Sequence, residues 1–158
     1  FLPWHFEEIE TQTDKSIKKL VDNNLLIIKE NEVKRPNVNS EEFIECQALG
    51  RIAQRSIDRF YILMLQLWRN EESHISINEL EKKCRKISKN LEARHSWLMP
   101  EFSEKWTFDL FINHLIEAKF VKKDEKGFVY PLNITKRIED DFKTFITPEW
   151  QEELFNLE

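Results

Sequence analysis

Glycine is scarce in this chain, which has only two glycines among its 158 residues. Loops that cradle phosphate groups or dinucleotides need several positions without a Cβ atom, because the backbone must approach the ligand closely. Two glycines cannot supply such a loop. The sequence therefore excludes the classes of nucleotide-binding protein that depend on one.

Cysteine is equally scarce, and Cys46 and Cys84 stand far apart with no C-x-x-C pair. This usage is typical of reduced thiols in a cytosolic compartment rather than of a disulfide framework. We expect both cysteines to be buried as small apolar side chains.

Long apolar runs and an excess of positive charge are missing as well. The longest nearly apolar stretch, residues 60–68, falls well short of the roughly 20 residues that a membrane-spanning helix needs. The formal net charge of −5 argues against a nucleic-acid contact over the whole surface, although a local basic face remains open. We expect no segment to cross a bilayer.

What the sequence does contain is enough apolar material for a core. Hydrophobic residues make up 41% of the chain, aromatic residues 12% and charged residues 34%, which is too apolar for a disordered segment. The chain opens at Phe1 in the middle of an apolar pattern, so we expect a piece of a longer protein.

Apolar spacing and capping residues predict several helices. The sequence S-I-N-E at residues 76–79 is a capping box that starts one of them, and Thr147 before Pro148 is a favourable start for the last. Short apolar runs separated by turn residues predict a two-stranded ribbon before Pro36 and another near Pro131. The expected helices cover residues 7–23, 41–68, 76–91, 102–119, 135–146 and 148–155.

One hydrophobic pattern occurs twice, displaced by 95 residues. The shift places Leu20 on Leu115 and Leu25 on Phe120, so a helix followed by a hairpin is predicted at both sites. The helix must end at a residue with positive φ, which suits Asn24 better than Lys119. Chance similarity between two amphipathic segments is the alternative interpretation.

These patterns predict a mainly α fold with two short β-hairpins, arranged as two winged-helix-like units joined by a long central helix. Residues 1–38 would form the first unit, residues 39–70 the long helix, and residues 71–158 the second unit with the C-terminal helices. The whole chain would be one C-terminal domain of a longer protein.

Charged residues on the long helix also have regular spacing. Arg51, Arg55, Asp58 and Arg59 are three to four residues apart, so we interpret them as ion pairs on an exposed turn rather than as ligands.

No constellation in the sequence predicts catalysis or metal binding. His5 with Glu10 and His74 with Glu79 have an H-x4-acid spacing, in which a carboxylate can orient an imidazole base, but Glu79 is already explained by helix capping. His95 and His114 lack partners at metal-ligand spacing. We therefore assign no catalytic residue, no metal site and no cofactor.

A basic run is the best candidate for a binding surface. Its lysines and arginine share one predicted helix and could contact an anion or an acidic membrane face, whereas a plain solvated helix face is the alternative. A DNA-reading winged helix would use residues 102–119, which offer few basic side chains, so nucleic acid is the less favoured partner. The candidate contact residues are Lys82, Lys83, Arg85, Lys86 and Lys89.

Residues 4–9, 51–82 and 80–121 together resemble the C-terminal region of the membrane-associated bacterial glycerol-3-phosphate acyltransferases. The sequence departs from the family at Lys119, where glycine is usual. The more specific matches are Leu80, Glu81, Lys82, Arg85, His95, Pro100, Glu101, Phe102, Lys105, Phe108, Leu115 and Phe120.

The resemblance implies a parent enzyme that moves an acyl group from acyl-CoA or acyl-carrier protein to the 1-hydroxyl of glycerol 3-phosphate, the first step of phospholipid synthesis. The family's H-x4-D motif has no counterpart in this chain. The resemblance thus implies a soluble, non-catalytic accessory region that supports an upstream acyltransferase domain of the same protein at the cytoplasmic face of the inner membrane. A winged-helix nucleic-acid-binding or protein-interaction module is the alternative.

Overall fold

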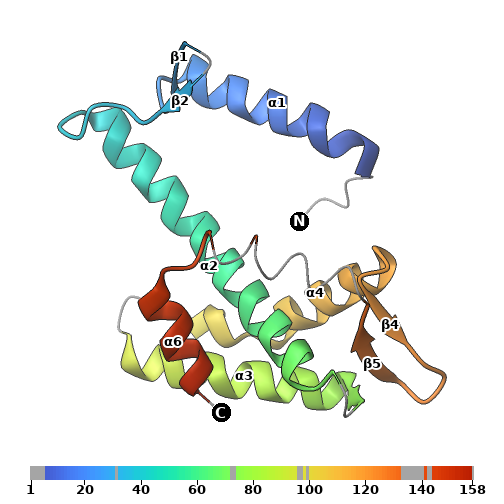
Figure 1. The fold of residues 1–158 in the computed structure, drawn as a ribbon. Coiled ribbons are helices and arrows are strands. Elements are labelled where there is room, and N and C mark those ends of the chain that lie inside the picture. Colours follow the sequence, from blue (N-terminus) through green and yellow to red (C-terminus); the bar gives the residue numbers. More distant parts are fainter. Residues whose placement is uncertain are drawn as a thin grey trace. The chain divides into compact units, whose positions relative to one another are not determined.

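The computed structural model describes residues 6–30, 32–71, 74–95, 98, 100–132, 141 and 144–157. The chain forms two compact units, Phe1–Ala53 and Gln54–Glu158. The boundary falls inside the longest helix, α2 (Glu41–Arg69), so each half of this helix belongs to a different unit (Figure 1). The division of the chain at residues 38 and 70 stays a prediction.

The first unit consists of a helix, a hairpin and the start of α2. The hydroxyl of Ser40 accepts a hydrogen bond from the backbone N–H of Phe43, 3.2 Å away, which confirms the predicted start of α2. Leu25, which precedes the hairpin in the sequence, and Pro36, which follows it, are both buried. The elements before α2 are α1 (Phe6–Asp22), β1 (Ile27–Lys29) and β2 (Glu32–Lys34).

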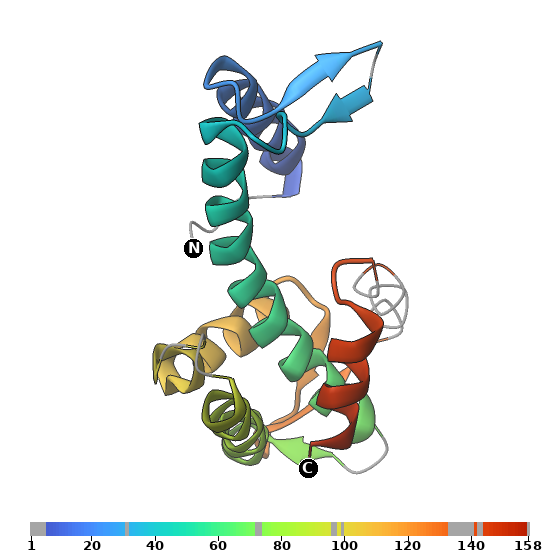
Figure 2. The ribbon, with the colours of Figure 1, turned by 90° about the vertical axis from the view of Figure 1, so that its left-hand side faces the viewer.

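The second unit places helices around the second half of α2. Helices α4 and α6 lie on opposite sides of this half of α2, as two perpendicular views show (Figures 1 and 2). A three-stranded antiparallel sheet has the order β3-β5-β4. The elements are β3 (Ile75–Ser76), α3 (Ile77–Arg94), the 3-10 helix η1 (Pro100–Ser103), α4 (Lys105–Glu117), β4 (Val121–Lys123), β5 (Phe128–Pro131) and α6 (Pro148–Asn156).

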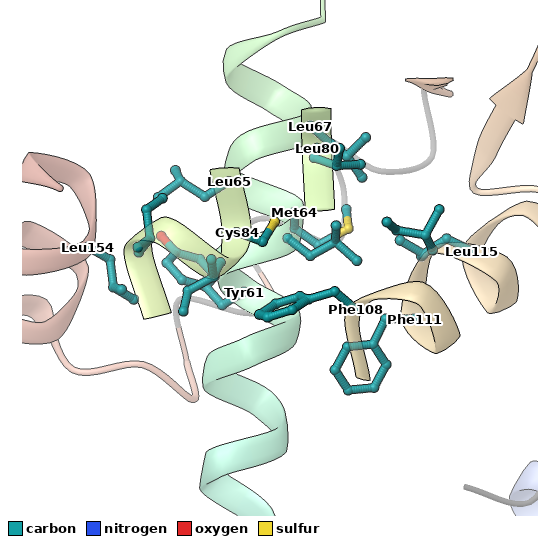
Figure 3. Packing of buried hydrophobic residues seen from close by; sticks show 14 of the residues in the cluster. Tyr61, Met64, Leu65, Leu67, Leu80, Cys84, Phe108, Phe111, Leu115 and Leu154 are labelled. Atoms are coloured by element: carbon teal, nitrogen blue, oxygen red, sulfur yellow. The ribbon is translucent and has the colours of Figure 1, made fainter. Parts of the chain in front are cut away.

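The core of the second unit surrounds α2. Residues 61–67 are all buried, in keeping with their almost continuous apolar character. Met64 is completely buried and lies beside Cys84 of α3 in Figure 3, with Phe108 of α4 nearby. Leu154 brings α6 into the same cluster. Burial of these side chains is the main stabilising contribution to the unit.

The repeated helix–hairpin junction is present in the structure. Asn24 and Lys119 both have a φ of 59°, and α1 and α4 end at positions 95 residues apart. The N–H of the next residue bonds back to the helix in each case, from Leu25 to the carbonyl of Leu20 (2.8 Å) and from Phe120 to that of Leu115 (2.9 Å). Both helices therefore end in the same left-handed turn.

The turns of the two hairpins differ in length. Two residues separate the paired Lys29 and Glu32, whereas five separate the paired Lys123 and Val129, and one of these five is Gly127 at a φ of 85°. The fold class, mainly helical with two small antiparallel sheets, is confirmed. Strand β3 was not predicted, because two residues give no periodic signal. The winged-helix-like description of the units stays a prediction.

Several detailed expectations were wrong. Asp58 is only 2% exposed instead of lying on a solvated turn, and Arg59 is half-buried. Cys84 is buried as expected, but Cys46 is only partly buried.

The predicted helix at residues 135–146 falls mostly outside the described residues. The last helix does begin after Thr147, whose hydroxyl accepts from the N–H of Trp150.

Candidate functional site

Helix α3 carries the basic residues predicted as a contact surface. It starts with the predicted capping box: the hydroxyl of Ser76 accepts from the N–H of Glu79 (3.3 Å), and the Glu79 carboxylate accepts from the N–H of Ser76 (3.4 Å). The helix contains six lysines and arginines against three glutamates, in a chain whose net charge is −5. Positive charge is thus concentrated on this element.

Four lysines of α3 are exposed, and we call them the α3 lysine face: Lys82, Lys83, Lys86 and Lys89. Helical spacing places Lys82, Lys86 and Lys89 on one side of the helix, with Lys83 at its edge. None of these four has an ion-pair partner among the residues that the structure describes. Their charges are therefore available to an external anion.

Arg85 differs from the four lysines. Its Nη1 lies 3.2 Å from Oε1 of the buried Glu81, and its Nε donates to the carbonyl of Ser103 at 3.2 Å. The guanidinium thus holds η1 against α3 and compensates the buried carboxylate. We assign Arg85 to this internal contact and leave it out of the α3 lysine face.

A second contact reinforces the junction between α3 and η1. The carboxylate of Glu92 accepts from the backbone N–H of Ser103 (2.8 Å) and from its hydroxyl (3.0 Å). Arg85, Glu92 and Ser103 form what we call the η1 clamp. The sequence alone gave no signal for it beyond the spacing of Arg85 and Glu92, two turns apart on one helix face.

The described histidines make internal contacts. Nε2 of His95, at the C-terminal cap of α3, lies 2.9 Å from Oε1 of Glu153, and its ring packs edge-on against Trp150 of α6. His114 lies 3.5 Å from Glu117 on its own helix, and His74 packs against Tyr130. His5, the first member of the other H-x4-acid pair, lies outside the described residues.

Two buried ionisable groups lie away from the α3 lysine face. Burial raises the pKa of Asp58 to about 6, although hydrogen bonds from Gln54 and Trp150 and the charge of Arg59 oppose the shift. Burial likewise raises the pKa of the Cys84 thiol, with the Glu81 carboxylate adding to the effect, so Cys84 stays protonated and a poor nucleophile at neutral pH.

The described part of the chain contains neither a group of metal ligands nor a helix that could span a membrane. Within it, no group of three histidine, cysteine or acidic side chains could hold a metal ion. None of its helices combines the length and the apolar character that crossing a membrane requires.

Comparison with known proteins places this arrangement in a family. Residues 1–124 match the model of the glycerol-3-phosphate acyltransferase C-terminal region. A glycerol-3-phosphate acyltransferase of Pseudomonas fluorescens (strain SBW25) is 30% identical over 127 residues, which are 80% of this chain and 15% of the relative. Proteins with the same name from Pseudomonas savastanoi pv. phaseolicola and Pseudomonas aeruginosa (strain LESB58) are 28% identical over the same shares.

The match covers the elements that carry the candidate site, since α1, α2, α3, η1 and α4 all lie within residues 1–124. No solved structure matches this chain. The chain spans only 15% of the length of the curated relatives that it matches. On the strength of the family match over most of its length, this chain belongs to the family of the glycerol-3-phosphate acyltransferase C-terminal region.

Proposed function

We propose that this chain is a non-catalytic accessory region of a glycerol-3-phosphate acyltransferase. In the full-length protein it supports an upstream acyltransferase domain, which transfers an acyl group to glycerol 3-phosphate. The observation that carries the proposal concerns His74 and Glu79, the H-x4-acid pair whose two members both lie in the described part of the chain. The Glu79 carboxylate caps the start of α3 instead of orienting the His74 imidazole. The sequence also holds no H-x4-D motif.

Exposed apolar side chains in the first unit support a contact with the upstream domain. Ile44 and Ile52, two turns apart on α2, are 66% and 65% exposed. Apolar side chains this exposed on one helix face are typical of a surface that a partner covers. The upstream segment is the partner that we propose, because about six-sevenths of each relative's length is not represented in this chain.

The α3 lysine face supports a second contact, with an anionic membrane surface at the cytoplasmic face of the inner membrane. Each lysine near such a surface adds about 1 kcal/mol of attraction, which falls off within a Debye length. Nucleic acid is less well supported as a partner, because the only lysine of α4 is Lys105, which lies 4.0 Å from the carboxylate of Asp109.

Vesicle sedimentation tests the membrane contact. Changing Lys82 and Lys89 to glutamate should abolish sedimentation with vesicles that contain phosphatidylglycerol, and added salt should weaken the binding of the parent chain. Changing Lys122 and Lys123 of β4 to glutamate alters the net charge by the same amount as the α3 variant and should leave most of the vesicle binding. Equal losses in both variants would contradict a specific role for α3.

An activity assay tests the accessory role. The chain of 158 residues should show no acyl transfer to glycerol 3-phosphate, whereas a full-length member of the family should lose activity when its upstream H-x4-D histidine is changed to alanine. Acyl transfer by the isolated chain would overturn the non-catalytic assignment.

A further inference from the structure

A hollow of 390 Å³ lies between the end of α2 and helix α3. This volume is within the range of about 300–1,000 Å³ that small-molecule sites occupy. We call it the Gln66 hollow. The residues that line it are Gln66, Arg69 and Asn70 of α2 and Lys83, Lys86 and Ile87 of α3.

The charged side chains that line the hollow are all positive among the described residues. Three of the six side chains are cations, and none of the described lining residues carries a carboxylate. Gln66 and Asn70 add amide groups, and Ile87, which is 2% exposed, contributes an apolar wall. A set of cations and amide donors around one space favours a ligand with several negatively charged oxygen atoms.

Gln66 is the feature that a surface of solvated lysines does not explain. Its side chain is only 5% exposed, and its Nε2 has no hydrogen-bond partner among the described residues. Buried amide donors are almost always paired, because leaving one unpaired costs its desolvation free energy. If this amide turned toward the hollow, a ligand oxygen there would supply the missing acceptor.

Neighbouring contacts hold three of the lining side chains in place. Nζ of Lys83 donates to Oδ1 of Asn70 at 2.8 Å, and Nδ2 of Asn70 donates to the carbonyl of Gln66 at 2.6 Å. Arg69 is fixed by hydrogen bonds to the carbonyls of Phe155 and Leu157 at the end of α6. Donors oriented before binding lose little conformational freedom when a ligand arrives.

We propose that the Gln66 hollow binds a phosphate monoester group. Such a group is mostly a dianion at neutral pH and offers three acceptor oxygens, which suits three cations and the Nε2 donor of Gln66. The group can come from a soluble phosphate ester or from the headgroup of a lipid such as phosphatidic acid. If the group belongs to a lipid headgroup, this proposal rests on the proposed membrane contact of α3 and extends it.

Titration of the whole chain with inorganic phosphate, methyl phosphate and phosphatidic acid vesicles tests the assignment. The probe is the side-chain amide resonance of Gln66 in ¹⁵N-labelled protein, identified by its loss in Gln66→Leu. Binding should shift this resonance saturably. Changing Lys83 and Lys86 to methionine should weaken binding of the responding probe at least tenfold. Changing Lys82 and Lys89 to methionine, on the same helix but outside the hollow, should change it less than twofold.

The three probes separate the two sources. A response to methyl phosphate assigns a soluble phosphate ester, and a response to phosphatidic acid vesicles alone, without one to phosphatidylcholine vesicles, assigns a lipid headgroup. No response to any probe, or equal weakening in both double variants, would overturn the hollow as a phosphate site. Loss of phosphatidylglycerol binding on changing Lys82 and Lys89 reports on the membrane contact separately, so either proposal can fail alone. Because the four lysines are exposed, these variants should keep the fold, which circular dichroism checks.

Discussion

Asn24 and Lys119 are 95 residues apart and have the same left-handed backbone conformation, with a φ of 59° at the end of equivalent helices. Each is followed by a hydrogen bond that returns to the last turn of its helix. Asparagine tolerates this conformation because its short polar side chain can bond locally, whereas a lysine there is strained. The two junctions therefore share one geometry, as the repeated hydrophobic pattern predicts.

Replacing Lys119 by glycine should stabilise the second unit. Removing the Cβ atom relieves a strain of about 1–2 kcal/mol, part of which is offset by the greater flexibility of glycine in the unfolded chain. We expect the free energy of unfolding in urea to rise by up to about 1 kcal/mol. Lys122→Gly, at an exposed site in β4, should lower it instead. A fall for both variants would contradict the strain at Lys119.

Asp58 should make stability depend on pH between about 4 and 6. Below this window both the folded and the unfolded chain carry the proton, whereas inside it only the folded chain does, because burial raises the pKa of Asp58 to about 6. The free energy of unfolding should therefore fall as pH rises through the window, by at most about 3 kcal/mol.

Asp58→Asn tests this dependence. The variant keeps a hydrogen-bonding side chain beside Gln54, whose Nε2 lies 2.9 Å from the Asp58 carboxylate, but it has no charge to bury. We expect its unfolding midpoint in urea to be higher than that of the parent chain at pH 7 and nearly equal at pH 4. Asp22→Asn, at an exposed position, should leave the parent's pH dependence intact. An unchanged slope in Asp58→Asn would contradict the assignment.

Breaking the η1 clamp should destabilise the second unit. Glu92→Ala leaves the N–H and the hydroxyl of Ser103 without their carboxylate, and Ser103 is only 7% exposed. Loss of such a buried pairing costs about 1–3 kcal/mol. Glu152→Ala removes an exposed glutamate from α6 and should change thermal stability by less than about 0.5 kcal/mol. Similar effects of the two changes would argue against the clamp.

The two cysteines should differ in reactivity. Cys84 is completely buried and burial raises the pKa of its thiol, whereas Cys46 is partly exposed in the first unit. A thiol reagent should therefore label one cysteine per folded chain and two in denaturant. Cys46→Ser should remove the fast reaction. Fast labelling that persists in this variant would mean that Cys84 is accessible.

Polar substitutions at Ile44 and Ile52 should affect the full-length protein more than the isolated chain. Both side chains are largely exposed here, so changing them to serine should alter the unfolding midpoint of the 158-residue chain little. In a full-length enzyme the same pair should lower thermal stability and acyltransferase activity, because it removes apolar surface from the proposed interface. Unchanged full-length behaviour would remove this surface from the interface.

Local signals in the sequence predicted most of the elements. Two examples are the capping box of Ser76 and Glu79 and the cap at Thr147. Both depend on neighbours within one turn, and the structure has them as expected. Hairpin details were harder, because the longer turn that contains Gly127 changes the register without changing the apolar pattern.

Roles that depend on distant segments could not be predicted in this way. The spacing of Asp58 with its arginine neighbours is that of a surface helix, whereas the tertiary structure buries its carboxylate and brings Trp150 of α6 within hydrogen-bonding reach of it. Arg85 fits the basic run by sequence, yet Ser103 of η1 gives it an internal role.

The sequence by itself determined most of the helices, the repeated junction and the family, because these follow from spacing and from residue types along the chain. Tertiary structure decided which charges are buried, which lysines stay exposed and that Gln66 comes to line a hollow with Lys83 and Lys86. Burial and pairing arise from contacts between segments far apart in sequence, which no local pattern encodes.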